Sequence, residues 1–251
     1  MNPNVASVIV FLSLATSALA GLLVYERFPF RHRDAETTNV IRLVASIFVV
    51  MTSLVLGLML NTAKNRFDSV NRDVHEFATE LILLDRNLRH YGAEADDARS
   101  KLKSYVELAA TFRATGYDQL LSADPRSEDA LDAFGGALRA LSPRDNDHLA
   151  LWNRARQGYE KIVGIRWGLL QQVESSIPTH LLVMVTCWLT LVFASFGYGA
   201  PRNPVVVASL LLAAALMAGT VNLILELDAP FFGSVVVSPA PLQRALNEVG
   251  R

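Results

Sequence analysis

The chain has 251 residues, of which 51% are hydrophobic and only 19% are charged. A soluble globular domain usually contains about 25% charged residues, so this composition indicates a membrane protein. The formal net charge is −1, and no basic excess is present that would predict a nucleic-acid partner. The single cysteine, Cys187, excludes an internal disulfide and any cysteine-rich metal site.

Four apolar blocks account for the hydrophobic excess, at residues 5–25, 40–60, 178–198 and 205–227. Each is about 20 residues long, the length that an α-helix needs to cross the hydrocarbon core of a bilayer. We therefore predict an all-α membrane protein with four transmembrane helices. Its predicted domains are a transmembrane hairpin at 1–61, a helical-bundle soluble domain at 62–177, a second hairpin at 178–228 and a C-terminal tail at 229–251.

The first span has two features that bear on its role. Residues 18–20 (Ala-Leu-Ala) resemble a signal-peptidase site, but no lysine or arginine lies before Glu26 and the apolar run continues past the site. We therefore favour a retained span over a cleaved signal. Ser13, Ser17 and Gly21 recur at four-residue spacing, which predicts a face where another helix backbone approaches closely.

The second span is predicted to continue into water as one unbroken helix over residues 39–91. No proline interrupts this segment, and no glycine follows Gly57 before Gly92. About 50 residues at 1.5 Å each give a rod of roughly 75–80 Å. A hinge near residues 57–61, which would give two helices, is the alternative.

An apolar heptad runs through this helix at alternating spacings of four and three residues, which keeps one stripe on one side. We predict that the stripe is an oligomerisation seam or the seam of a bundle. Its members are Leu60, Phe67, Val70, Val74, Phe77, Leu81, Leu84 and Leu88.

Three further amphipathic helices are predicted at 93–115, 127–142 and 145–176, and they can bury a bundle core with the end of the long helix. Ser127 is expected to start the second of them after a loop built on Pro125. No strand pattern competes, apart from a short β-like segment at 234–237. Four spans place both chain ends and the bundle on one side of the membrane, and the flanking charges do not decide which side.

No motif of catalysis or cofactor binding is present. The chain has no P-loop and no G-x-G-x-x-G, H-E-x-x-H or G-x-S-x-G sequence. Glu76 and Glu80 lie four residues apart, but the Glu-x-x-His partners of a carboxylate-bridged metal site are absent. We therefore expect a solvated helix face there, with no metal, no cofactor and no enzymatic activity.

Polar residues in the second span are more informative, because polar groups in hydrocarbon are costly and mark interfaces or pathways. One side of the helix carries small and polar residues between two cations: Arg42, Ser46, Ser53, Gly57, Asn61 and Lys64. This side suits the lining of an anion pathway in an oligomer, with Val49, Val50 or Leu54 as a hydrophobic constriction. The alternative is that the small residues only allow helix packing, while Arg42 and Lys64 reach the two membrane surfaces.

The fourth span carries two polar residues at helical spacing, Asn222 and Glu226. We expect Asn222 to bond to a neighbouring helix, since an unsatisfied polar group is costly in hydrocarbon, and Glu226 to lie near the water. Residues 230–233, which follow the span, are expected to fold back on it as a structural cap, because proline and glycine fix turns.

The end of the chain carries the sequence Leu227-Asp228-x-Pro230-Phe231-x-Gly233, followed by Ser238-Pro239 and Leu242. With the layout of two spans, a helical middle and two spans, it resembles the bacterial bestrophin-like family of four-span membrane proteins. The tail motif of this resemblance consists of Asp228, Pro230, Phe231 and Gly233. The resemblance covers nearly the whole chain, and the tail motif is its most specific part.

The family name implies a distant similarity to the bestrophins, which are pentameric chloride channels whose second helix lines the pore and whose middle domain is cytosolic. The resemblance therefore implies a homo-oligomer, a pentamer, that passes small anions through the bacterial inner (plasma) membrane. The sequence departs from the bestrophins at the neck, where Val49, Val50, Ser53 and Leu54 stand in place of bulky rings. The acidic calcium clasp of the bestrophins has no counterpart either.

Two functions follow from these observations. The first is an oligomeric anion channel lined by the second span, with the lipid bilayer and small anions as partners. The second is a non-conducting membrane sensor or scaffold, in which the heptad of the long helix acts as a lever or an oligomerisation seam.

Overall fold

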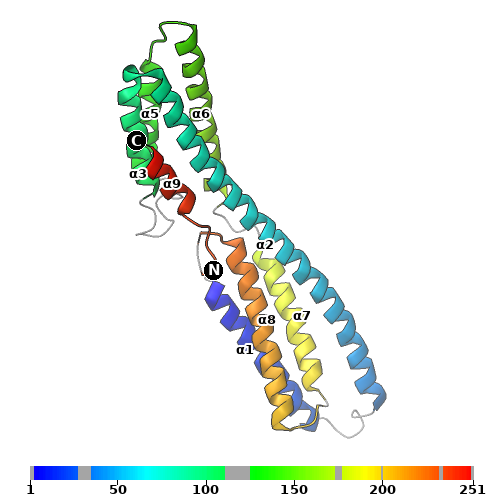
Figure 1. Cartoon of the computed structure of the whole chain (residues 1–251). Coiled ribbons are helices and arrows are strands. Elements are labelled where there is room, and N and C mark those ends of the chain that lie inside the picture. The colour runs from blue at the N-terminus through cyan, green and yellow to red at the C-terminus, as the bar shows by residue number, and fades with distance from the viewer. Residues whose placement is uncertain are drawn as a thin grey trace. The chain divides into compact units, whose positions relative to one another are not determined.

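The computed structural model describes residues 3–27, 35–110, 125–172, 177–198, 200–231 and 234–249. Within these ranges the regular structure is helical, as predicted (Figure 1). The elements are α1 (Pro3–Arg27), α2 (Ala35–Tyr91), a short 3-10 helix (Ala93–Ala95), α3 (Asp96–Ala110), α5 (Pro125–Ala140), α6 (Asn146–Gln171), α7 (Thr179–Gly197), α8 (Pro204–Asp228) and α9 (Ala240–Glu248). Four of them, α1, α2, α7 and α8, are long and apolar enough to cross a membrane.

The chain divides into two compact units. One, called here the transmembrane unit, comprises Met1–Arg66 and Ser175–Asp228, and the other, the bundle unit, comprises Phe67–Glu174 and Ala229–Arg251. The domain boundaries predicted at residues 61, 177 and 228 stay predictions, because a unit defined by compactness need not end where the hydrocarbon ends.

Helix α2 is a single helix of 57 residues, which confirms the predicted unbroken helix and removes the hinge at 57–61. Gly57 does not break it, since a glycine costs a helix only about 1 kcal/mol relative to alanine. One stripe of α2 is buried along its length, and this stripe contributes to both cores. Leu56, Met59 and Ala63 lie in the core of the transmembrane unit.

Of the predicted seam, Leu60 is exposed and Phe67 is partly buried, whereas the other six residues lie in the core of the bundle unit. These six are Val70, Val74, Phe77, Leu81, Leu84 and Leu88.

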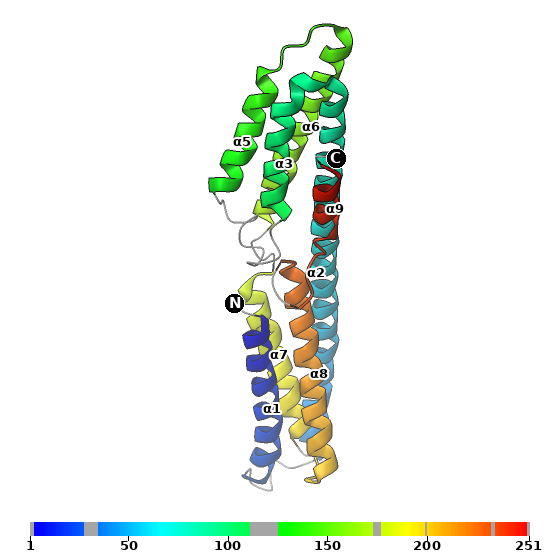
Figure 2. The same ribbon diagram turned by 60° about the vertical axis from the view of Figure 1, so that its left-hand side comes forward.

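In the transmembrane unit, α1 packs against α7 and α8 (Figure 2). The small residues of α1 make the closest approach, as predicted from their spacing. A side chain on Gly21 would clash with the backbone oxygen of Ala194 in α7, and one on Gly197 would clash with the backbone oxygen of Ala18 in α1. Ser13 adds a hydroxyl contact, with its Oγ atom 3.2 Å from a hydroxyl oxygen of α7.

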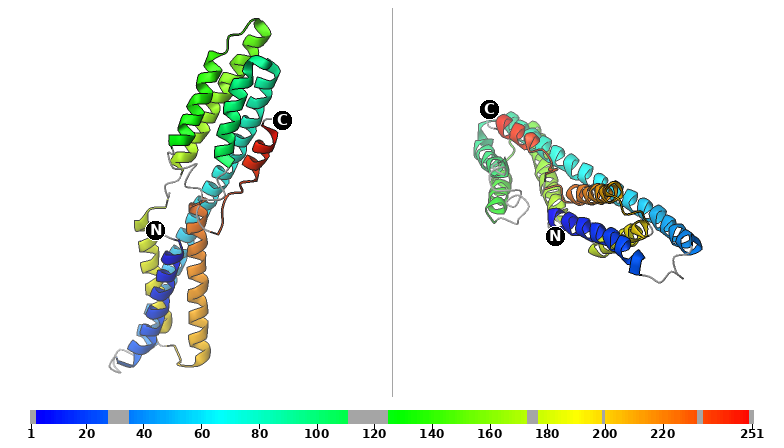
Figure 3. Two further views of the ribbon diagram at one scale, coloured as in Figure 1. Left: turned by 90° about the vertical axis from the view of Figure 1, so that its left-hand side faces the viewer. Right: turned by 90° about the horizontal axis from the view of Figure 1, so that it is seen from below.

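In the bundle unit, α3 packs against α5 and α9, and α5 contacts α6 (Figure 3). Helix α5 begins at Pro125, not at Ser127 as predicted, because proline fits the first turn of a helix, where its missing N–H is not needed. Asp145 caps α6, and its side chain accepts the backbone N–H of His148 at 2.8 Å. Residues 111–115 and 173–176, which were predicted to end the first and third bundle helices, lie outside the described residues.

The predicted β-like segment at 234–237 is not a strand. The backbone N–H of Val237 donates to the carbonyl oxygen of Pro230 at 3.0 Å, which closes a local loop and leaves no strand ladder among the described residues there. Leu242 and Ala245 of α9, which follow this loop, are buried in the core of the bundle unit. The tail therefore completes the bundle.

Gly197→Ala should lower the melting temperature of the protein in detergent. The new methyl group would overlap a backbone oxygen of α1, and overpacking of this kind costs about 1–3 kcal/mol. Gly219→Ala in α8 is the matched control, because nothing lies within 4 Å of the added atom there. Equal thermal shifts in the two variants would contradict the close packing of α1 on α7.

Candidate functional site

Helix α2 presents two different sides within the transmembrane unit. Its buried side is formed by Ala45, Thr52, Leu56, Met59 and Ala63, none of which is more than 8% exposed. All eight residues predicted to line a pore lie outside this stripe and are exposed: Arg42, Ser46, Val49, Val50, Ser53, Gly57, Asn61 and Lys64. In a single chain, therefore, none of the eight side chains is used to build the core.

The exposed side of α2 consists of two sectors that run side by side along the helix. At 100° per residue, the positions of Arg42, Ser46, Ser53, Gly57 and Lys64 fall within an arc of about 60°. Leu60 shares this arc, whereas Asn61 falls outside it at the same angle as Leu43. The sector beside this arc carries large aliphatic side chains, among them Leu43, Leu54 and Leu58, which are 66%, 75% and 65% exposed. The helix thus has a small and polar stripe next to a broad aliphatic sector that suits lipid.

The two cations of the stripe are separated by about the thickness of a bilayer core. Arg42 and Lys64 are separated by 22 positions, or about 33 Å along a helix, which is close to the ~30 Å thickness of a bilayer core. Between them the stripe is uncharged, and Ser46 donates its hydroxyl to the backbone oxygen of Leu43 at 2.7 Å. Its oxygen keeps acceptor capacity, and Gly57 leaves open space, with nothing within 4 Å of where a Cβ atom would be.

A second polar cluster lies at the end of α8, and sequence reasoning described it wrongly. Glu226 was expected near water but is only 4% exposed. Asn222 was expected to bond to another helix, whereas its Nδ2 atom donates to Oε1 of Glu226 in the same helix at 3.0 Å. The spacing of Asn222 and Glu226 predicts that they share a face of the helix, but it does not predict how deeply their side chains are buried.

Asp228 of the tail motif anchors the start of α7 to the end of α8. Its carboxylate is 2% exposed and accepts the backbone N–H of Ile177 at 3.3 Å. Its other oxygen lies 4.0 Å from Nε of Arg66 in α2. A buried carboxylate with a backbone donor and a nearby cation is well stabilised, which gives this motif residue a structural role.

The rest of the tail motif lies in the bundle unit. Phe231 is 4% exposed and belongs to the bundle core, while Pro230 supplies the carbonyl oxygen that closes the loop described above. Gly233 lies outside the described residues. The predicted cap of α8 by residues 230–233 stays a prediction.

The paired carboxylates Glu76 and Glu80 form salt bridges with a lysine. The Nζ atom of Lys161 in α6 lies 2.8 Å from a carboxylate oxygen of each, and these two hydrogen bonds raise the pKa of the lysine. Among the residues that the structure describes, no group of three or more histidine, cysteine or acidic side chains is placed to hold a metal ion.

The burial of Arg166 in α6 was not predicted from the sequence. It is 4% exposed, and its Nε and Nη2 atoms have no hydrogen-bond partner in the described part of the chain. A signal was available in the sequence, because Ile162 and Leu169 flank Arg166 at helical spacing and are both buried. An arginine in an apolar register is unusual, since an unpaired buried charge is costly.

Comparison with known proteins identifies the family. A family model described as the Bestrophin-like domain matches residues 12–242. The chain belongs to the bestrophin-like family. This membership confirms the resemblance read from the tail motif and the layout of the spans.

The bestrophin-like fold is also found by comparison with solved structures. The chain matches the crystal structure of a mutant bacterial bestrophin homolog from Klebsiella pneumoniae with a TM-score of 0.66 and 13% sequence identity. The match covers 96% of this chain and 97% of the other, so it extends over both compact units. No curated protein matches the sequence.

Asp228→Ala should destabilise the protein, because it removes the buried carboxylate that accepts the backbone N–H of Ile177. Such a loss costs about 1–3 kcal/mol, and a thermal scan in detergent would show it as a lower melting temperature. Asp228→Asn keeps an oxygen acceptor and should lose less. If the alanine variant melted with the wild type, the anchoring role of Asp228 would be wrong.

Proposed function

We propose that this bestrophin-like membrane protein is an oligomeric channel for small anions, with the polar stripe of α2 lining the pore. The observation that carries the proposal is that every predicted pore-lining residue of α2 is exposed in one chain. Membership of the family supports it, since the bestrophins conduct chloride through a pore lined by their second helix.

The physical argument is one of solvation. Serine, arginine and lysine side chains facing hydrocarbon along a whole span would cost several kcal/mol, and polar residues in spans therefore face a bundle interior or a water-filled cavity. Copies of α2 arranged around a symmetry axis would place their stripes toward a shared aqueous path. The adjacent aliphatic sector of each α2 would then meet neighbouring helices or lipid.

The charges of the stripe favour anions. Arg42 and Lys64 would form a cationic ring at each mouth of the pore, and the hydroxyl of Ser53 between them can donate to an anion, whereas the hydroxyl of Ser46 already donates to the backbone oxygen of Leu43. Val49 and Val50 flank the stripe and would form the narrowest apolar section, a constriction that can gate by dewetting. The small residues at this level replace the aromatic neck of the bestrophins and predict a wider or less selective constriction.

Assembly and orientation follow from the resemblance. We propose a homo-oligomer, a pentamer by analogy with the bestrophins, in the bacterial inner membrane with the bundle unit on the cytosolic side. That the chain is not an enzyme stays a prediction.

A second function is favoured by the continuity of α2, which contributes to both cores. A helix shared in this way would also suit a non-conducting sensor or scaffold. Halide flux separates the two functions, because a well-folded and monodisperse oligomer that passes no halide would support the sensor or scaffold.

Ser53→Trp should abolish halide flux into proteoliposomes, because an indole on the stripe would fill the proposed pore near its centre. Leu58→Trp is the matched control on the same helix, since Leu58 is 65% exposed on the aliphatic sector and should tolerate a large apolar group. The oligomer size of both variants would be checked on the same preparations. Wild-type flux in Ser53→Trp would show that the stripe does not line the pore.

A further inference from the structure

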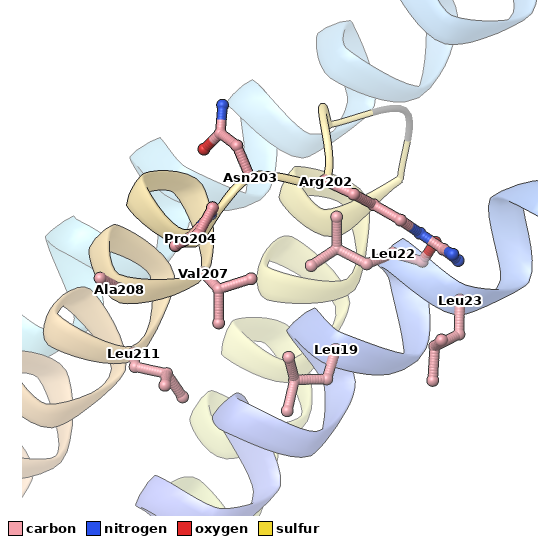
Figure 4. Close-up of a pocket in the computed structure, with 9 residues that line it drawn as sticks. All are labelled: Leu19, Leu22, Leu23, Arg202, Asn203, Pro204, Val207, Ala208 and Leu211. Carbon is pink, nitrogen blue, oxygen red and sulfur yellow. The ribbon is translucent and has the colours of Figure 1, made fainter.

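A groove runs between α1 and α8 in the transmembrane unit (Figure 4). Its volume is about 690 Å³, which is in the range of small-molecule sites, and it is an open groove and not an enclosed cavity. Its walls are mainly aliphatic, with Leu19 and Leu22 from α1 and Val207 and Leu211 from α8. Arg202, in the turn before α8, closes one end.

The polar end of the groove is built from fixed groups. Arg202 donates from Nη2 to the backbone oxygen of Leu22 at 2.9 Å, which holds its guanidinium against α1. Asn203 caps the first turn of α8, where its Oδ1 atom accepts the N–H of Val206 at 2.8 Å. The start of α8 adds a positive helix-dipole end beside the arginine, and such ends favour anions.

These two features define the chemistry of an occupant. Arg202 lies between the end of α7 at Gly197 and the start of α8 at Pro204, which places it at the surface of the bilayer, whereas Leu211 lies about 10 Å deeper along α8. An occupant must therefore have an apolar portion in the hydrocarbon and an anionic group at the surface. The surrounding bilayer itself supplies molecules of this kind.

We propose that the groove binds an anionic phospholipid, with one acyl chain along α1 and α8 and the phosphate at Arg202. Basic sites between transmembrane helices recognise lipid head groups in this manner. A neighbouring protein chain would need to offer both a slender apolar segment and an acid at the surface. The charge at the rim favours the lipid, and the inference does not depend on whether the protein conducts ions.

The test is native mass spectrometry of the full-length protein in mild detergent, titrated with phosphatidylglycerol or with phosphatidylcholine of the same acyl chains. The wild type should retain phosphatidylglycerol preferentially. Arg202→Gln should weaken phosphatidylglycerol binding about fivefold and leave phosphatidylcholine binding unchanged, as expected for one cation near the surface. Arg202→Lys, which keeps the charge, should restore most of the preference.

The apolar part of the site is tested by filling it. Ala208→Trp places an indole in the groove and should reduce the binding of both lipids, whereas Leu212→Trp, at a position that is 62% exposed but does not line the groove, should not. Melting temperatures of both tryptophan variants would show that each is folded. The Arg202 variants test the head-group site even where Ala208→Trp fails to fold.

Two results would overturn the proposal. One is equal binding of the two lipids by the wild type. The other is a change of oligomer size in Ala208→Trp with phosphatidylglycerol binding intact, which would make the groove a contact between copies of this chain. A protein that binds phosphatidylglycerol at Arg202 but passes no halide would leave the lipid site intact and refute only the channel.

Discussion

The hydrocarbon core of a bilayer offers no hydrogen-bond partner to a peptide backbone, and the rest of this structure depends on that constraint. It requires each span to be a helix, which satisfies its own backbone. In α2 the helix does not end with the hydrocarbon but continues to Tyr91, because no proline or helix-ending glycine intervenes. One buried stripe then serves two cores, with Ala63 in the transmembrane unit and Val70 in the bundle unit.

The apolar stripe of α2 packs into these two cores. The remaining surface of the helix is not needed for this packing, and it carries two sectors of different composition. The aliphatic sector around Leu54 and Leu58 suits lipid, whereas the stripe from Arg42 to Lys64 is small and polar. A lone chain would expose the polar stripe to hydrocarbon, which is costly. In the proposed channel, assembly around an aqueous path would remove that cost, so the same stripe would account for both oligomerisation and anion passage.

Much of the fold could be predicted from the sequence because it rests on local properties. Span lengths, the unbroken α2 and the small-residue face around Gly21 all follow from residues close together in the chain. The errors concern properties set by distant neighbours. Asp228 is stabilised by the N–H of Ile177, 51 positions away, and the burial of Glu226 and Arg166 depends on helices packed around them. The pore lining stays a prediction, because what faces the exposed stripe in the membrane is not specified by spacing within one chain.

The proposed pore requires the stripe of α2 to face water within the membrane, and thiol labelling tests this most directly. Cys187 is the single native cysteine, so Cys187→Ser gives a clean background for Ser53→Cys and, separately, Leu58→Cys. In proteoliposomes, a membrane-impermeant thiol reagent should label Cys at position 53 and leave position 58 unlabelled. Labelling of position 58 but not 53 would contradict the account, because the aliphatic sector and not the polar stripe would then face the aqueous path.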